Sequence, residues 1–176
     1  NKPILVIKSG RCYEARELLD ATESLDAAWD AAIRRAGMLR VKDTHELFSA
    51  VETLSHMRPL RGERLFIISN GAAPAALALD ELHTRKGVLA PMSPELTQAL
   101  QSGLPPTVRT GNPLNLQDDA TTERYLSVMT PLLDCQDIDA LMIIHAPSAV
   151  SPASECAMEI IRRVREHPRG RRLTLL

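Results

Sequence analysis

The amino-acid sequence predicts an α/β fold in which a parallel sheet carries helices on both faces. In the stretch 64–87, an apolar run of strand length breaks at Ser-Asn-Gly and resumes as an Ala- and Leu-rich segment of helical length. Further strands then alternate with helices of about 10 to 15 residues, the rhythm of βαβ units. The most hydrophobic strand, at 138–144, precedes a strongly amphipathic helix. Together these features favour parallel strands joined by covering helices.

Composition narrows the class of protein. The chain has 176 residues, of which 44% are hydrophobic and 24% charged, as in a globular domain that buries a core. A net charge of −1 gives no general electrostatic reason to expect nucleic acid or a membrane surface as a partner. No run approaches the ~18 apolar residues of a membrane span. The three cysteines form no CxxC pair, so we expect no metal site and a reducing, cytoplasmic location.

Two units are predicted, at residues 1–57 and 58–176, because Pro and Gly interrupt both periodicities within 56–63. The chain begins almost directly with a strand at 3–7, and the segment 172–176 has the pattern of a strand with nothing after it. A parallel strand needs a neighbour and a covering helix. We therefore expect the fold to be truncated at both ends.

The first unit contains a modest helical pattern after its strand and a clearer helix at 24–36. Gly37 stands at the C′ position of that helix. After a short extended piece, Asp43 and Glu46 form a capping box that begins the next helix. The periodicity predicts that four side chains make this helix's buried face: Leu47, Phe48, Val51 and Leu54.

The second unit begins with a strand at 64–69 and a helix at 74–86, with Pro74 at the first helical position and Ala73 as N-cap. A proline and a serine cap predict another helix start at Ser93. The remaining elements are a strand at 88–90, a helix ending at 103, an irregular segment at 105–119, a helix at 121–133, the strand at 138–144 and a helix at 153–164.

The turn between the strand and helix of 64–87 is a candidate anion site. An alanine N-cap has no side-chain oxygen, so the first-turn amides, with that of Gly71, are left to face an anion such as a phosphate. The alternative is that small residues simply allow close packing of helix on sheet, since the pattern is neither a P-loop nor GxGxxG. The candidate binding residues are Ser69, Asn70, Gly71, Ala72 and Ala73.

Ligands of such sheets bind beyond the carboxyl ends of the strands. This places Asn70 and His145 on the same edge, and the irregular segment 105–119, which contains Asn112, is a further candidate for it. His145 alone among the five histidines has a functional position, although a hydrogen-bonded structural histidine fits it equally well. The residues by themselves thus support a flavodoxin-like domain with a candidate anion site.

Five stretches, in order and spacing, resemble the NDP-forming acyl-CoA synthetase family, which is related to succinyl-CoA synthetase. They are residues 7–11, 30–37, 41–54, 69–74 and 112–116. The resemblance implies that residues 1–57 are the C-terminal part of a phosphohistidine (CoA-ligase) domain and 58–176 most of a second flavodoxin-like domain. In that family a histidine relays phosphate between an acyl phosphate and NDP, and helix N-termini steady the phosphorylated ring.

The chain departs from this family between residues 11 and 26, where active members carry a Ser-His-Thr-Gly-Ser type segment. No histidine precedes His45, and the nearest counterpart by position is Asp20. A carboxylate can form an acyl phosphate, but it does not relay phosphate as an imidazole does, and Glu23 would repel an incoming phosphate. The resemblance therefore implies a degenerate module with no catalytic residue.

Within the superfamily the chain resembles the synthetase-like region of large bacterial protein lysine acetyltransferases, most closely at residues 47–61. That resemblance implies a parent that uses acetyl-CoA to acetylate metabolic enzymes such as acetyl-CoA synthetase, through a GNAT domain outside this chain. Protein substrates and a small-molecule acyl-CoA are the implied partners, with ATP or ADP as a remnant ligand. Two alternatives stay open: a fragment of an active NDP-forming acyl-CoA synthetase (acid-thiol ligase), or a module for homo-oligomerisation or interaction only.

Overall fold

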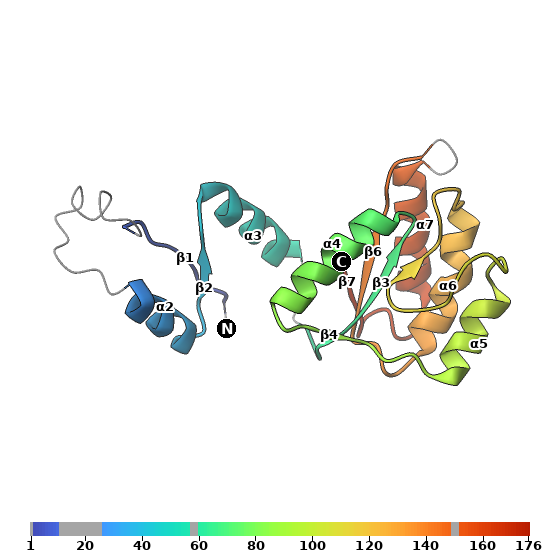
Figure 1. Ribbon diagram of the computed structural model, residues 1–176, viewed down its shortest axis with the longest axis horizontal. Helices are drawn as coiled ribbons and strands as arrows, with labels where there is room; N and C mark the ends of the chain where they lie inside the picture. The colour runs from blue at the N-terminus through green and yellow to red at the C-terminus, as the bar shows by residue number, and fades with distance from the viewer. Residues whose placement is uncertain (1, 11–25, 57–59, 149–151) are drawn as a thin grey trace. The chain divides into compact units, whose positions relative to one another are not determined.

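The computed structural model describes residues 2–10, 26–56, 60–148 and 152–176. It contains two compact units, Asn1–Arg58 and Pro59–Leu176, and each is described by itself. Figure 1 shows the elements of both units in chain order.

The first unit pairs two short parallel strands, β1 (Leu5–Ile7) and β2 (Leu39–Val41). Between them lies α2 (Asp26–Arg35), and Gly37 after it has a φ of +69°, as its predicted C′ position requires. Helix α3 (Thr44–His56) follows β2. The predicted helical pattern after β1, together with Asp20, lies outside the described residues.

The capping box of α3 is confirmed in part. Asp43 Oδ1 accepts from the Glu46 amide at 2.8 Å, whereas the Glu46 carboxylate accepts from the amide of Lys42 rather than from that of Asp43. The predicted buried face of this helix is wrong, since no residue of α3 is fully buried: Leu47 and Leu54 are half-buried, Phe48 is 71% exposed and Val51 is 49% exposed.

The second unit is a five-stranded parallel sheet in which β3 (Arg64–Ser69) is central. Its order is β4-β3-β6-β7, and β5 pairs with the carboxyl end of β3. The longest pairing joins β3 to β6, from Leu65 opposite Ala140 to Ser69 opposite Ile144. The other strands are β4 (Val88–Leu89), β5 (Leu114–Asn115), β6 (Ala140–Ile144) and β7 (Thr174–Leu175).

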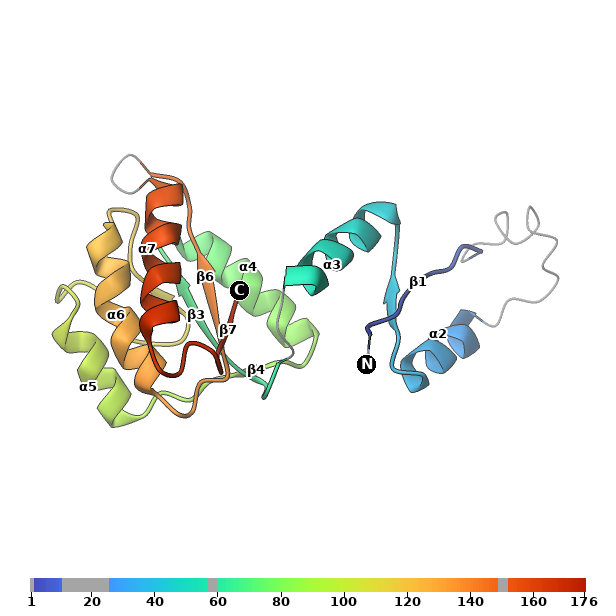
Figure 2. The same ribbon diagram turned by 180° about the vertical axis from the view of Figure 1, so that it is seen from behind.

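Helices cover both faces of this sheet, as the sequence predicted (Figures 1 and 2). On one face, Leu65 and Ile67 pack with side chains of α4 (Ala72–Thr84). On the other, Phe66 and Ile68 belong to a larger core with side chains of the remaining helices. These are α5 (Pro94–Ser102), α6 (Thr122–Asp134) and α7 (Ala153–Glu166). None of the described helices is both long and apolar enough to cross a membrane.

The start of α4 differs from the prediction. The helix begins at Ala72, its N-cap is Gly71, and Pro74 is its third residue rather than its first. Proline is tolerated there because the amides of the whole first turn have no acceptor within the helix, and the two alanines are good helix formers. At α5 the prediction is confirmed, since Ser93 Oγ accepts from the Leu96 amide at 3.1 Å and Pro94 is the first helical residue.

Candidate functional site at the carboxyl edge of the sheet

The sheet reverses its winding direction between β3 and β6. The connection through α4 leads from β3 to β4 on one side, whereas the connection through α7 leads from β6 to β7 on the other. The two helices consequently cover opposite faces. The edge beyond the carboxyl ends of β3 and β6, called the crevice below, is the usual ligand position in such sheets. Asn70 and His145 follow these two strand ends directly, so they lie on the same edge, as expected.

Asn70 ties the two strand ends together. Its side chain is buried, with 2% exposed. The Nδ2 group donates to the carbonyl of Ala146 at 2.8 Å, and Oδ1 accepts from the amide of the same residue at 2.7 Å. Both functional groups of the side-chain amide are therefore engaged by backbone, and Asn70 holds the crevice in shape.

The turn predicted to bind an anion leaves fewer backbone amides for it than expected. Ser69 Oγ accepts from the Gly71 amide at 3.0 Å and donates to the Gly71 carbonyl at 2.9 Å. The prediction that the Gly71 amide faces an anion is therefore wrong in this structure. The N-cap of α4 supplies no side-chain hydrogen bond. The amides of Ala72 and Ala73 lie in the first turn, where the helix itself offers them no acceptor, and the anion hypothesis now rests on these two.

His145 stands beside Tyr125 of α6, with 5.7 Å between ring centroids and 32° between ring planes. The Tyr125 hydroxyl donates to the carbonyl of Ile144 at 3.3 Å, and burial raises the pKa of this hydroxyl. The rings of both residues belong to the face of the sheet covered by α6 and α7. On that face His145 lines a cavity of about 280 Å³ against α7.

Asn112 lies away from the crevice, on the side of β3 between β4 and β5. Its Oδ1 accepts from the amide of Ile67 at 3.0 Å, and its Nδ2 donates to the carbonyls of Leu65 at 2.9 Å and Ala90 at 3.1 Å. β4 pairs only with the start of β3 and β5 only with its end. Asn112 replaces the missing strand between them, so its side-chain amide is engaged by the sheet and is not directed at a ligand.

The sequence analysis did not identify Arg124, which lies at the carboxyl edge of the sheet beside β5. This side chain donates to the carbonyl of Leu116 at 2.8 Å, just past the end of β5, and pairs with Asp119. The hydrogen bond from Arg124 lowers the pKa of the Asp119 carboxyl. The only signal in the sequence is the proximity of an acid and an arginine around the start of α6.

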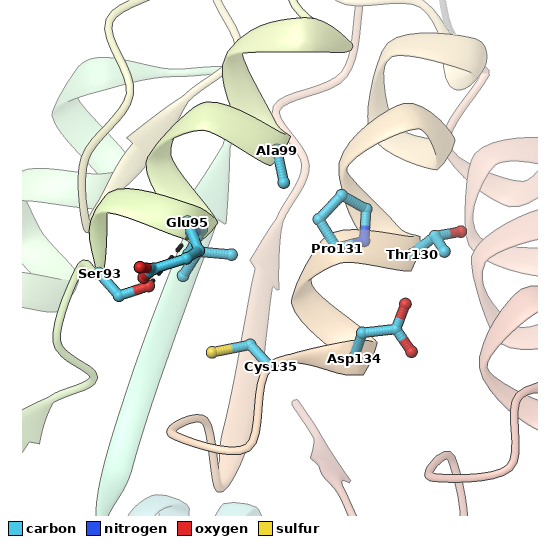
Figure 3. Close-up of a pocket in the computed structure, with 8 residues that line it drawn as sticks. Ser93, Glu95, Ala99, Thr130, Pro131, Asp134 and Cys135 are labelled. Atoms are coloured by element: carbon cyan, nitrogen blue, oxygen red, sulfur yellow. Dashed lines mark hydrogen bonds between the residues drawn. The ribbon is translucent and has the colours of Figure 1, made fainter.

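A groove of about 390 Å³ between α5 and α6 was also missed (Figure 3). Glu95 and Ser93 approach it from the first turn of α5, and Asp134 and Cys135 from the end of α6. Since α6 ends where the chain turns towards the start of β6, this groove lies at the opposite edge of the sheet from the crevice. Across the described ranges no group of three or more His, Cys, Asp or Glu side chains could hold a metal ion.

Comparison with known proteins places this geometry in context. Residues 1–54 match the family model described as "Succinyl-CoA ligase like flavodoxin domain". The first unit is therefore similar to that domain.

Curated relatives extend the similarity over the whole chain. The acetate–CoA ligase [ADP-forming] II subunit alpha of Pyrococcus furiosus is 28% identical over 97% of this chain and 38% of its own length. The 4-hydroxybutyrate–CoA ligase [ADP-forming] of Nitrosopumilus maritimus is 27% identical over 94% of this chain and 24% of its own length. The chain thus spans well under half the length of these archaeal relatives.

Solved structures show the same fold. The apo form of the dinucleotide forming acetyl-coenzyme A synthetase 1 of Ca. Korarchaeum cryptofilum superposes with a TM-score of 0.86 at 24% identity, over 99% of this chain and 38% of that one. PH0766 from Pyrococcus horikoshii OT3 superposes with a TM-score of 0.77 at 28% identity, over 98% of this chain and 37% of that one. The chain therefore has the succinyl-CoA ligase-like α/β fold.

The comparisons correct the order of the functional hypotheses. The named relatives are ADP-forming ligases from archaea, and no name among them is that of an acetyltransferase. The similarity is to NDP-forming acyl-CoA synthetases and their α subunits, so the ligase alternative is better supported than the acetyltransferase segment.

Proposed function

We propose that this chain is a segment of an NDP-forming acyl-CoA synthetase, an acid-thiol ligase that joins a carboxylic acid to CoA at the expense of a nucleoside triphosphate. The observation that carries the proposal is the collinear similarity to two such ligases over 94–97% of the chain. A fold match over 99% of the chain supports it. The ligands of the whole protein would then be CoA, a carboxylic acid, phosphate and ADP, and its location cytoplasmic.

Within that enzyme the segment would hold ligands at the crevice beyond β3 and β6. The first-turn amides of α4 are suited to an anionic oxygen, because the helix dipole and unbonded N–H groups both favour negative charge there. Asn70 would keep this helix start at a constant distance from the end of β6. Inorganic phosphate is the probe for this site, and its addition to the intact protein should shift the amide resonances of Ala72 and Ala73.

The test of the ligase function is made on the intact protein that contains this chain. Acetate, CoA, ATP and Mg²⁺ are supplied, and acetyl-CoA and ADP are measured. Equal amounts of the two products are expected. Asp20→Asn should abolish turnover if Asp20 takes the place of the relay histidine, and Asp80→Asn, on the exposed surface of α4, serves as the matched carboxylate control.

A second candidate is a non-catalytic regulatory segment of an acetyl-CoA-dependent protein lysine acetyltransferase. One observation favours it: no histidine precedes His45, so the part of the chain that resembles the phosphohistidine segment lacks an imidazole. In that case the intact protein forms no ADP from ATP and acetate, but transfers acetyl groups from acetyl-CoA to lysines of a protein acceptor such as acetyl-CoA synthetase.

A further inference from the structure

The cavity beside His145 has the build of a small-ligand pocket. It lies between β6, β7 and α7 and measures about 280 Å³. Ile143 and Leu175 come from the strands, and Ala157 and Ile160 from the helix. Small side chains near the start of α7 leave the space open there, and the isoleucine one turn later narrows it.

The lining is almost entirely hydrocarbon. Among the described residues that line it, only His145 and Cys156 have polar side-chain atoms, and Cys156 is buried, with 1% of the residue exposed. None of the described lining residues has an acidic side chain, so these residues offer no carboxylate to a cationic ligand. An imidazole can donate a hydrogen bond and carry positive charge, which suits an anionic head group.

The size of the cavity limits the ligand. A cavity of roughly 150 Å³ with aliphatic and aromatic walls holds benzene. This cavity, at about 280 Å³, has room for a body of that size and a carboxylate beside it. It also opens near the carboxyl end of β6, next to the point where the sheet reverses direction and where ligands of such folds bind.

We propose that this cavity binds the hydrocarbon part of a monocarboxylic acid of about six to eight carbons, judged against the benzene-sized cavity, with the carboxylate at His145. The choice of an acid rests on the proposed ligase function, because such an enzyme handles carboxylic acids. The binding itself follows from the cavity and is measured without turnover.

The experiment uses the intact protein with ¹³C-labelled isoleucine methyl groups, titrated with hexanoate. Saturable shifts are expected at Ile143, Ile160 and Ile161, which line the cavity, and none at Ile138, which is buried at the other end of β6. Hexylamine, with the same chain and the opposite charge, should bind at least tenfold more weakly. Absence of shifts at the three lining isoleucines, or equal affinity for the amine, would overturn the proposal.

Two variants separate this pocket from other sites. Ala157→Leu fills the cavity from an exposed position on α7, so it should weaken hexanoate binding at least tenfold without unfolding the protein. Ala76→Leu makes the same change at an exposed position of α4 and should leave binding unchanged. If both variants bind hexanoate normally, the proposal fails. Hexanoate binding in a protein that forms neither acetyl-CoA from acetate nor hexanoyl-CoA from hexanoate would instead refute the ligase function alone.

Discussion

Asn70 and Asn112 direct their side-chain amides at backbone atoms far away in sequence. Asn70 bonds the backbone of Ala146, and Asn112 bonds three backbone groups of β3 and the segment after β4. Each supplies both donor and acceptor, which an aspartate or a serine cannot do in the same geometry. Asn70 therefore shapes the edge of the sheet on which a ligand would rest, whereas Asn112 fills the side of β3 between β4 and β5.

Replacement of Asn70 by alanine should destabilise the second unit by about 2 kcal/mol, because it leaves the part-buried amide and carbonyl of Ala146 without their partner. The measurement is urea unfolding followed by circular dichroism. Gln101→Ala, which removes an exposed amide side chain from α5, should change stability by less than about 0.5 kcal/mol. Equal effects of the two substitutions would contradict the assigned role of Asn70.

For single residues, the sequence predicted where a side chain lies in the fold better than it predicted which atoms that side chain contacts. Asn70 and His145 were expected on one edge because both follow strongly apolar strands. The partner of Asn70 lies 76 residues away, and no local pattern reveals that its amide would be used by backbone. The Ser69 hydroxyl likewise engages the Gly71 amide through a turn that the letters Ser-Asn-Gly permit but do not require.

Arg64, at the start of β3, forms ion pairs with Asp137 and Asp139, which lie just before the start of β6. Asp139 accepts from the backbone amide of Arg64 at 3.1 Å and from the guanidinium at 2.9 and 3.0 Å. The hydrogen bonds from Arg64 are the main cause that lowers the pKa of the Asp139 carboxyl to about 2. The bridge connects the two longest strands at the edge opposite the candidate site.

This bridge predicts a pH dependence of stability. Because the pKa of Asp139 is lower in the folded than in the unfolded protein, its contribution is complete above about pH 4, where the unfolded carboxyl is ionised, and is lost as the pH falls towards 2. Asp139→Asn should destabilise the protein at pH 7 by about 1–2 kcal/mol and flatten the loss of stability between pH 4 and 2.

Urea midpoints measured at intervals across that pH range provide the check. Asp80→Asn, on the exposed surface of α4, is the matched control and should retain the acid-dependent loss of stability. If Asp139→Asn shows the same slope between pH 4 and 2 as the unsubstituted protein, the Arg64 bridge is not its source.

Element boundaries were predictable where caps have a chemical signature. Ser93 before proline and glutamate identified the start of α5, and the glycine after α2 identified its end. The start of α4 was placed two residues late, because alanine carries no capping signature and proline fits anywhere in the first turn. In α3 the apolar periodicity was real, but periodicity does not say how much surface exists to cover it, and Phe48 is exposed.

For the molecule as a whole, the alternation of strands and helices was sufficient to predict a parallel sheet covered on both faces. The reversal between β3 and β6, which creates the crevice, depends on strand order, and strand order is a property of long-range pairing. The function was harder to predict than the fold. The absence of the relay histidine favours a non-catalytic segment, whereas the similarity over the rest of the chain favours a ligase.

The central claim, that this chain belongs to a working acyl-CoA synthetase, is tested most directly in the reverse direction. The intact protein is incubated with acetyl-CoA, ADP, Mg²⁺ and ³²P-labelled phosphate, and the label in ATP is counted. The account predicts labelled ATP and free CoA in equal amounts, dependent on both acetyl-CoA and ADP. Label that never enters ATP, while acetyl groups pass from acetyl-CoA to protein lysines, would contradict it.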